Sequence, residues 1–214
     1  IRAGTTLHDI TPIRATFTST ATNNCFTTTS GSGVVTVAIT GHGATDGDFV
    51  TFSGAAAVGG VTAAQLNQNF EITYINPNSF SISTAGTATS AATGGGTGIT
   101  AAFEINIGPD TSVGGYGWGT STWGRGTWGS GSATPALISV RLAFMDNFND
   151  DLIFNLSDEG PIFYWDFSAG FNTRAVLLSS ISGAIAVPTK TEQTFFAPSG
   201  HFLALGCSEY SQVD

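Results

Sequence analysis

The sequence predicts an all-β protein, because helix-forming residues are scarce, short apolar runs recur, and turn residues separate those runs. Lysine and methionine each occur once among the 214 residues, whereas glycine occurs 28 times and threonine is abundant. This composition favours strands and turns over helices. A chain of 214 residues is long enough for one or two domains with a buried core.

The first set of predicted strands lies between residues 34 and 105. Phe70, Ile72 and Tyr74 share one face of an extended segment, and Phe80 and Ile82 share one face of the next. The intervening Asn-Pro-Asn turn signal predicts a hairpin. The other predicted elements are strands at 34–40, 48–53 and 99–105, a short helical turn at 63–67, and an irregular Ala/Thr/Ser/Gly-rich loop at 85–98.

A second set of short strands is predicted from residue 137 onward, separated by Gly- and Pro-containing turns. These segments follow one another at a spacing of roughly ten residues, which is typical of a sandwich or a propeller. Several are apolar on both faces, so we expect them to lie between packed layers. The predicted strands are 137–144, 152–156, 162–166, 174–179, 193–196 and 202–206.

Together these patterns predict a small antiparallel β-barrel inserted into a β-propeller-like or sandwich-like multi-strand domain. A Gly/Trp-rich connector joins the two. The expected division of the chain is the end of a preceding β segment at 1–33, the barrel at 34–105, the connector at 106–135, and propeller-like blades at 136–214 that continue beyond the last residue.

The connector contains the segment GYGWGTSTWGRGTWGSG, in which Trp118, Trp123 and Trp128 recur every fifth residue and each precedes a glycine. The indoles are candidates to fill pockets on a neighbouring surface, with glycines allowing close backbone approach; alternatively, they stack on sugars or bases. Arg125 is a candidate partner for an acidic surface or an indole. Trp165, in the second strand set, is a further packing or interface candidate.

The charge balance limits the classes of partner. Fifteen carboxylates against six bases give a net charge of −9, which argues against non-specific binding to nucleic acid. Only 10% of residues are charged, so we expect much of the surface to contact other subunits. The sequence contains no run of 18 apolar residues, and we expect no membrane span.

The acidic residues, histidines and cysteines are not arranged in a recognisable catalytic, metal-binding or nucleotide-binding motif. We therefore expect no enzyme activity, no bound metal and no cofactor. The acidic stretch from residue 146 to 166 lacks calcium-loop spacing and is better explained by turn capping. His42 is expected to be structural, and His201 with Cys207 has no visible orienting group. No phosphate-loop motif occurs, and Lys190 is the only lysine. Cys25 and Cys207 are expected to be unpaired.

The stretches GHGATDGDFVTFSG and LNQNFEITYINPNSFSI resemble the small β-barrel known as the first catalytic cysteine half-domain of ubiquitin-activating enzymes. The matching positions run from His42-Gly43 through Asp46-Gly47-Asp48 to Phe80-Ser81-Ile82, about a third of the chain. The adenylation domain, nucleotide loop and catalytic cysteine context of those enzymes are missing, so the resemblance implies a fold and no ubiquitin chemistry.

The wider sequence resembles a tailed-phage virion protein of the nozzle or tail-tube type that carries such a barrel as an insertion. The matching stretches are LHDITPIRATF, YGWGTSTWGRGTWG, FNDDLIFNLSDEGPIFYWDFS and APSGHFLALG. The resemblance implies a ring in the virion tail, expected to be a homohexamer, that contacts adaptor and fibre proteins and passes genomic DNA without specific binding. The alternative is a host-recognition or carbohydrate-binding module of a fibre or adhesin.

Overall fold

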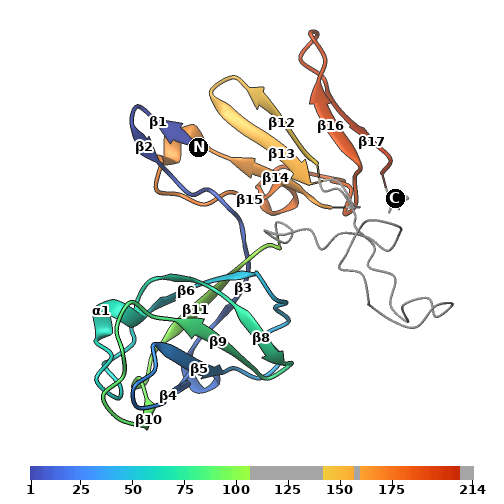
Figure 1. Cartoon of the computed structure of the whole chain (residues 1–214). Coiled ribbons are helices and arrows are strands. Elements are labelled where there is room, and N and C mark those ends of the chain that lie inside the picture. Colours follow the sequence, from blue (N-terminus) through green and yellow to red (C-terminus); the bar gives the residue numbers. More distant parts are fainter. Residues whose placement is uncertain (107–141, 157–159, 208–214) are drawn as a thin grey trace, which may run out of the picture.

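The computed structural model describes residues 1–106, 142–156 and 160–207, and this part of the chain is all-β, which confirms the predicted class (Figure 1). Its one α-helix, α1 (Ala63–Leu66), lies at the predicted helical turn. The Thr62 hydroxyl accepts a hydrogen bond from the Gln65 backbone, and the Gln65 side chain accepts one from the Thr62 backbone. This capping box explains why a helix begins here.

Residues 13–104 form a unit that we term the insert, built from two antiparallel sheets. The first has the strand order β10-β4-β5-β9-β8 and the second β3-β11-β6-β7. Over these described residues both sheets are open, so the insert is a sandwich and not a closed barrel. The strands are β3 (Ile13–Phe17), β4 (Phe26–Thr28), β5 (Val34–Ala38), β6 (Phe49–Ser53), β7 (Asn69–Glu71), β8 (Thr73–Asn76), β9 (Ser79–Ser83), β10 (Ala92–Gly94) and β11 (Thr100–Glu104).

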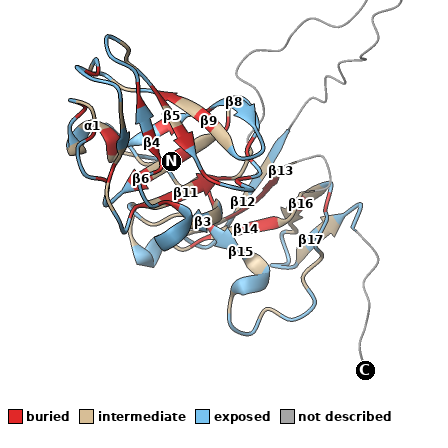
Figure 2. Ribbon diagram, turned by 90° about the horizontal axis from the view of Figure 1, so that it is seen from below, coloured by how far each residue is buried: buried red, intermediate tan, exposed pale blue. Residues whose placement is uncertain are grey.

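The core of the insert lies between these two sheets, and aromatic rings from both sheets meet there. Phe26 of the first sheet packs edge-on against Phe52 of the second, with ring centroids 4.9 Å apart. Phe80 and Phe103 make a similar contact across the sheets at 5.7 Å. Twenty residues form this buried cluster, and Figure 2 shows the buried positions along the insert strands. Alternation of inward apolar and outward polar residues on each strand produces this arrangement.

Three predicted features of the insert differ from the structure. The single strand expected over residues 69–75 is two strands, β7 and β8, which belong to different sheets. The chain crosses between the sheets at Ile72, which is buried. The loop expected at 85–98 contains β10, an edge strand paired with β4. Strands β3 and β4 precede residue 34 and pair with β11 and β5, so sheet pairing begins before the predicted boundary.

The remaining described residues, 1–10 and those after 141, form a second unit that we term the frame. Its main sheet is a four-stranded antiparallel meander of consecutive strands, and the hairpin β16-β17 lies beside it (Figure 1). A small N-terminal hairpin, β1-β2, also belongs to this unit. The strands are β1 (Arg2–Ala3), β2 (Thr6–Leu7), β12 (Ala143–Phe148), β13 (Asp151–Leu156), β14 (Ile162–Trp165), β15 (Val176–Leu177), β16 (Gln193–Phe196) and β17 (Phe202–Leu205).

Short 3-10 turns connect strands in both units: η1 follows β3 in the insert, and η2 and η3 follow β14 and β15 in the frame. The carboxylate of Asp166 caps the second turn by accepting hydrogen bonds from the backbone and side chain of Ser168, both at 2.7 Å. These bonds lower the pKa of the exposed Asp166 carboxyl. The three turns are η1 (Ser19–Ala21), η2 (Phe167–Ala169) and η3 (Leu178–Ser180).

Candidate assembly interface

The main sheet of the frame is covered on one face by the hairpin β16-β17, and buried Asn155 on β13 makes this contact. Its amide nitrogen donates to the backbone carbonyl oxygens of Thr191 at 3.1 Å and Glu192 at 3.2 Å. Its amide oxygen accepts from the Thr194 hydroxyl at 2.8 Å. Asn155 and Thr194 are both buried, so these bonds satisfy polar groups that would otherwise oppose the packing of the hairpin.

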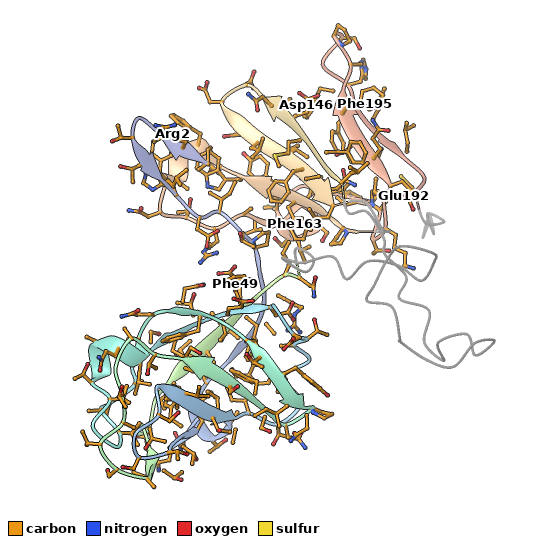
Figure 3. The ribbon with its side chains drawn as sticks, viewed as in Figure 1. Arg2, Phe49, Asp146, Phe163, Glu192 and Phe195 are labelled. Carbon is orange, nitrogen blue, oxygen red and sulfur yellow. The ribbon has the colours of Figure 1, made fainter. Side chains whose placement is uncertain are left out.

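A second contact on the same face joins β12 to the last residue of β16. The Asp146 carboxylate accepts a hydrogen bond from the Phe196 backbone at 2.7 Å, and Phe148 stacks on Phe196 with centroids 5.2 Å apart. Figure 3 shows Asp146 on β12 beside the hairpin that carries Phe195. Asp146 therefore supplies a side-chain partner for a strand that has no backbone pairing with β12.

The opposite face of the main sheet is packed by the chain segments that lead to the insert. Trp165, which is 1% exposed, stacks on Phe171 at 5.9 Å, and its indole nitrogen donates to the Thr173 carbonyl at 3.0 Å. Ile10, just before the insert, and Ile105, just after it, pack against the same cluster. The sheet is thus a middle layer between the hairpin and the two connecting segments.

The outer side of the hairpin presents apolar side chains to solvent. Phe195 pairs with Leu203 and Gln193 pairs with Leu205 in the strand register, so these four side chains share the face turned away from the main sheet. Leu203 is 40% exposed and Leu205 is 50% exposed. A strand that is apolar on both faces is typical of a position between layers, and here only the inner face is covered among the described residues.

Exposed large apolar residues are concentrated in the frame. Of fourteen in the described part of the chain, eleven belong to the frame and three to the insert. Six apolar residues of the frame are buried, against twenty in the insert core. The exposed frame residues are Ile1, Leu7, Leu142, Met145, Phe148, Phe167, Val176, Leu177, Ile185, Leu203 and Leu205. Among them, Leu203 and Leu205 lie on one face of the hairpin and are the candidates for a surface that another layer covers.

The frame and the insert meet at Arg174, which follows η2. Its guanidinium lies 2.6 Å from the Asp9 carboxylate and 3.1 Å from the Glu104 carboxylate, and it donates to the Thr11 carbonyl at 3.0 Å. Nearby, the backbone of Ala175 donates to the Ile10 carbonyl at 2.9 Å. Residues on the incoming and outgoing segments of the insert therefore share one cation of the frame.

Glu104 is the buried member of this group, with a side chain that is 6% exposed. Burial raises the pKa of its carboxyl, and the nearby Asp9 carboxylate adds to the rise. Hydrogen bonds from Arg174 and from the Asn69 amide, at 2.7 Å, oppose it without cancelling it. The carboxylate is thus held in a place where its charge is costly unless Arg174 is present.

A shallow pocket of about 250 Å³ lies beside Arg174 at this junction. Its lining is mainly apolar and includes Pro12, Ile13, Phe163 and Leu177. Phe163 lies on the side of the main sheet that faces the connecting segments (Figure 3). The guanidinium in this pocket is already engaged by two carboxylates and a carbonyl, so the pocket offers no unpaired charge to a ligand.

The predicted interface residues have different outcomes. Trp165 is buried in the frame. Trp118, Trp123, Arg125 and Trp128 lie outside the described residues, so the alternatives for them stay predictions.

The histidines and cysteines have local structural partners. His42 is buried, stacks on Phe103, and lies between the Asn76 carbonyl at 2.9 Å and the Ala44 backbone N–H at 3.1 Å. His201 bonds Ser199, whereas the Cys207 thiol donates to the Ala204 carbonyl. Cys25 and Cys207 are unpaired, and burial raises the pKa of the Cys25 thiol to about 11.

The described carboxylates of the acidic stretch from residue 146 to 166 act mainly as hydrogen-bond acceptors within the frame. Asp151 accepts from the Tyr164 hydroxyl at 2.5 Å and from the Phe167 backbone at 3.0 Å. The bond to Asp151 raises the pKa of the Tyr164 hydroxyl to about 12. Asp158 and Glu159 lie outside the described ranges. Within those ranges no group of three or more potential ligands could hold a metal ion, and no helix is long and apolar enough to cross a membrane.

Sequence reasoning did not identify Arg174 or Asn155 as key contacts. Arg174 is one of only six basic residues, and its scarcity is the one signal that could have marked it. Asn155 interrupts an apolar strand, and a polar residue at a buried position requires partners. The partners of both residues are distant in the sequence, so neither contact could be inferred from spacing.

No protein-family model matches the chain, and no curated protein matches it. Among solved structures, the chain is similar to one described as "Phage phi92 endosialidase", with 16% sequence identity and a TM-score of 0.35. The similarity covers 86% of this chain and 26% of that chain, so this chain spans about a quarter of the length of that protein. A similarity this low determines neither the fold nor the activity of this chain.

Proposed function

We propose that this chain is a non-enzymatic structural component of a phage virion tail, in which the frame assembles with neighbouring subunits and the insert is displayed from it. One observation carries the proposal: the frame buries six apolar residues while leaving eleven large ones exposed. A unit with this imbalance gains stability when another layer covers it, since each buried large side chain contributes roughly 1.5–3 kcal/mol.

The finer assignment is a nozzle or tail-tube ring, expected to be a homohexamer that contacts adaptor and fibre proteins. A four-stranded antiparallel meander has the form of one propeller blade, and the hairpin packed on its face supports the frame as part of a propeller. The resemblance of the stretches APSGHFLALG and FNDDLIFNLSDEGPIFYWDFS to nozzle-type proteins points the same way.

The acidic balance supports passage of genomic DNA through such a ring without specific binding. A net charge of −9 repels phosphates and disfavours the counterion release that drives non-specific binding to DNA. Lysine substitutions of carboxylates that line the lumen are expected to slow DNA ejection, and unchanged ejection kinetics would count against this part of the proposal.

The test is quantitative mass spectrometry of purified virions, with the copy number of this chain set against that of the major capsid protein. A copy number that matches one sixfold ring is the expected result. Copies in multiples of three that match the fibres would instead favour the host-recognition module, and absence from virions would contradict both assignments.

A further inference from the structure

We propose that Arg174 is a latch that fixes the orientation of the insert on the frame across a two-strand hinge. This inference does not depend on the tail assignment, because it concerns only the junction between the two units. It rests on how the chain enters and leaves the insert, on the separation of the two cores, and on the three contacts of one guanidinium.

The hinge lies where the sheet pairing of the insert ends. The register between β3 and β11 shifts between Phe103 and Glu104, which marks a bulge at the end of the paired region. Past it, the Ile105 backbone donates to the Pro12 carbonyl at 3.0 Å. Bulges bend a strand and end its pairing. Beyond the bulge the outgoing segment keeps this backbone bond and a side-chain bond, at 2.9 Å, from the Asn106 amide to the Thr45 hydroxyl of the insert.

The two segments are anchored on the frame side of this point. Ile10 and Ile105 pack against the Trp165 cluster, and the Ile10 carbonyl accepts from the Ala175 backbone. No backbone ladder joins an insert sheet to a frame sheet among the described strands. Each unit also has its own buried cluster, so rotation about the hinge disrupts neither core.

Arg174 spans the hinge. On the frame side it holds the Asp9 carboxylate and the Thr11 carbonyl, and its contact across the hinge is to the Glu104 carboxylate at the end of the insert. Glu104 is fixed in turn by the Asn69 amide from β7. The planar guanidinium can serve three acceptors at once, whereas a lysine ammonium on the same stem lacks that fork geometry.

The test measures the distance between the two units by double electron–electron resonance. Spin labels are placed at two exposed positions, Ser83→Cys on the insert and Asn147→Cys on the frame, in a Cys207→Ser background; Cys25 is buried and remains unlabelled. The native latch is expected to give one narrow distance distribution. Arg174→Met is expected to broaden it, and Arg174→Lys is expected to give an intermediate width.

Arg14→Met is the matched control, because Arg14 bonds only within the insert: its guanidinium donates to the His42 carbonyl and lies 5.8 Å from the Phe103 ring centroid. A narrow, unshifted distribution in Arg174→Met, or equal broadening in Arg14→Met, would overturn the proposal. If Arg174→Met does not fold, Glu104→Gln replaces it, with broadening expected and an unchanged width contradicting the latch.

Amide hydrogen exchange gives an independent readout at the hinge. Loss of charge-assisted bonds worth about 1.4 kcal/mol or more is expected to speed exchange of the Ile105 amide roughly tenfold in Arg174→Met. Exchange in the buried strands β5 and β9 is expected to stay the same. Equal acceleration in those strands would show that Arg174 stabilises the whole insert and would contradict a latch.

Discussion

The insert and the frame are similar all-β units that bury their side chains to very different extents. The insert encloses twenty residues in one cluster between two sheets, whereas the frame cluster has four members (Figure 2). Large exposed apolar residues show the opposite distribution, with three in the insert and eleven in the frame. Over the described residues, the insert is therefore the better-packed unit, and the frame leaves more of its large apolar side chains exposed.

The largest expected effect is on the insert core. Phe80→Ala removes a fully buried ring that contacts both Phe52 and Phe103, and it is expected to lower the free energy of unfolding by about 3–5 kcal/mol. Calorimetry of the variant measures the loss. Val34→Ala, at an exposed position of β5 in the same unit, is the control and is expected to change the value by less than about 0.5 kcal/mol.

The next largest effect is expected where the hairpin β16-β17 packs on the main sheet of the frame. Asn155→Ala leaves the Thr194 hydroxyl and two backbone carbonyls without their partner, and it is expected to cost about 1–3 kcal/mol. Hydrogen exchange is expected to rise in β16 and β17 and to stay constant in the insert. Asn147→Ala, at an exposed site of β12, serves as the control; if it had the same effect, the assigned role of Asn155 would be wrong.

The free energy of unfolding is expected to depend on pH through Glu104 at the junction between the two units. The pKa of Glu104 in the folded state is raised above its ordinary value of 4.5. At pH values between 4.5 and this raised pKa, the folded state therefore binds more protons than the unfolded state. The Glu104 contribution to the free energy of unfolding therefore falls as pH rises through this window. Chemical denaturation at several pH values is expected to show this decline in the native chain and a flatter profile in Glu104→Gln. If the free energy of unfolding changed with pH equally in the native chain and in Glu104→Gln, the raised pKa of Glu104 would be refuted.

The smallest expected effect is a difference in labelling rate between the two cysteine thiols, one in each unit. Cys25 lies in the insert core with a pKa of about 11, whereas Cys207 is exposed at the end of the frame hairpin. A maleimide at neutral pH is expected to label Cys207 at once and Cys25 only when the insert opens, since the thiolate is the reactive form. Labelling of Cys25 as fast as Cys207 would mean that the insert is not a closed unit.

The sequence predicts much of the insert, because its strands alternate apolar and polar residues and its turns carry Asn, Pro and Gly. Phe80, Ile82 and the 76–78 turn lie as expected. The prediction fails at Ile72, since a chain that crosses between sheets keeps the same alternation. It also fails for closure of the barrel, because strand order depends on contacts between distant residues.

The frame and its junction could be predicted less well. The run RAVLLS indicates a six-residue strand, but β15 spans only Val176–Leu177 before a 3-10 turn. Arg174 precedes it, and its carboxylate partners lie 165 and 70 residues away in the sequence, at Asp9 and Glu104. Local patterns carry no information about such pairs. Trp165, by contrast, stands in an apolar strand, and its burial follows from that context.

Sedimentation velocity across a range of concentrations tests whether the apolar surface of the frame is an assembly surface. The native chain is expected to self-associate as its concentration rises, and the double substitution Leu203→Ser and Leu205→Ser is expected to weaken that association while the insert keeps its melting temperature. A native chain that stays monomeric at every concentration, or a variant that associates as strongly as the native chain, would contradict an assembly role for this surface.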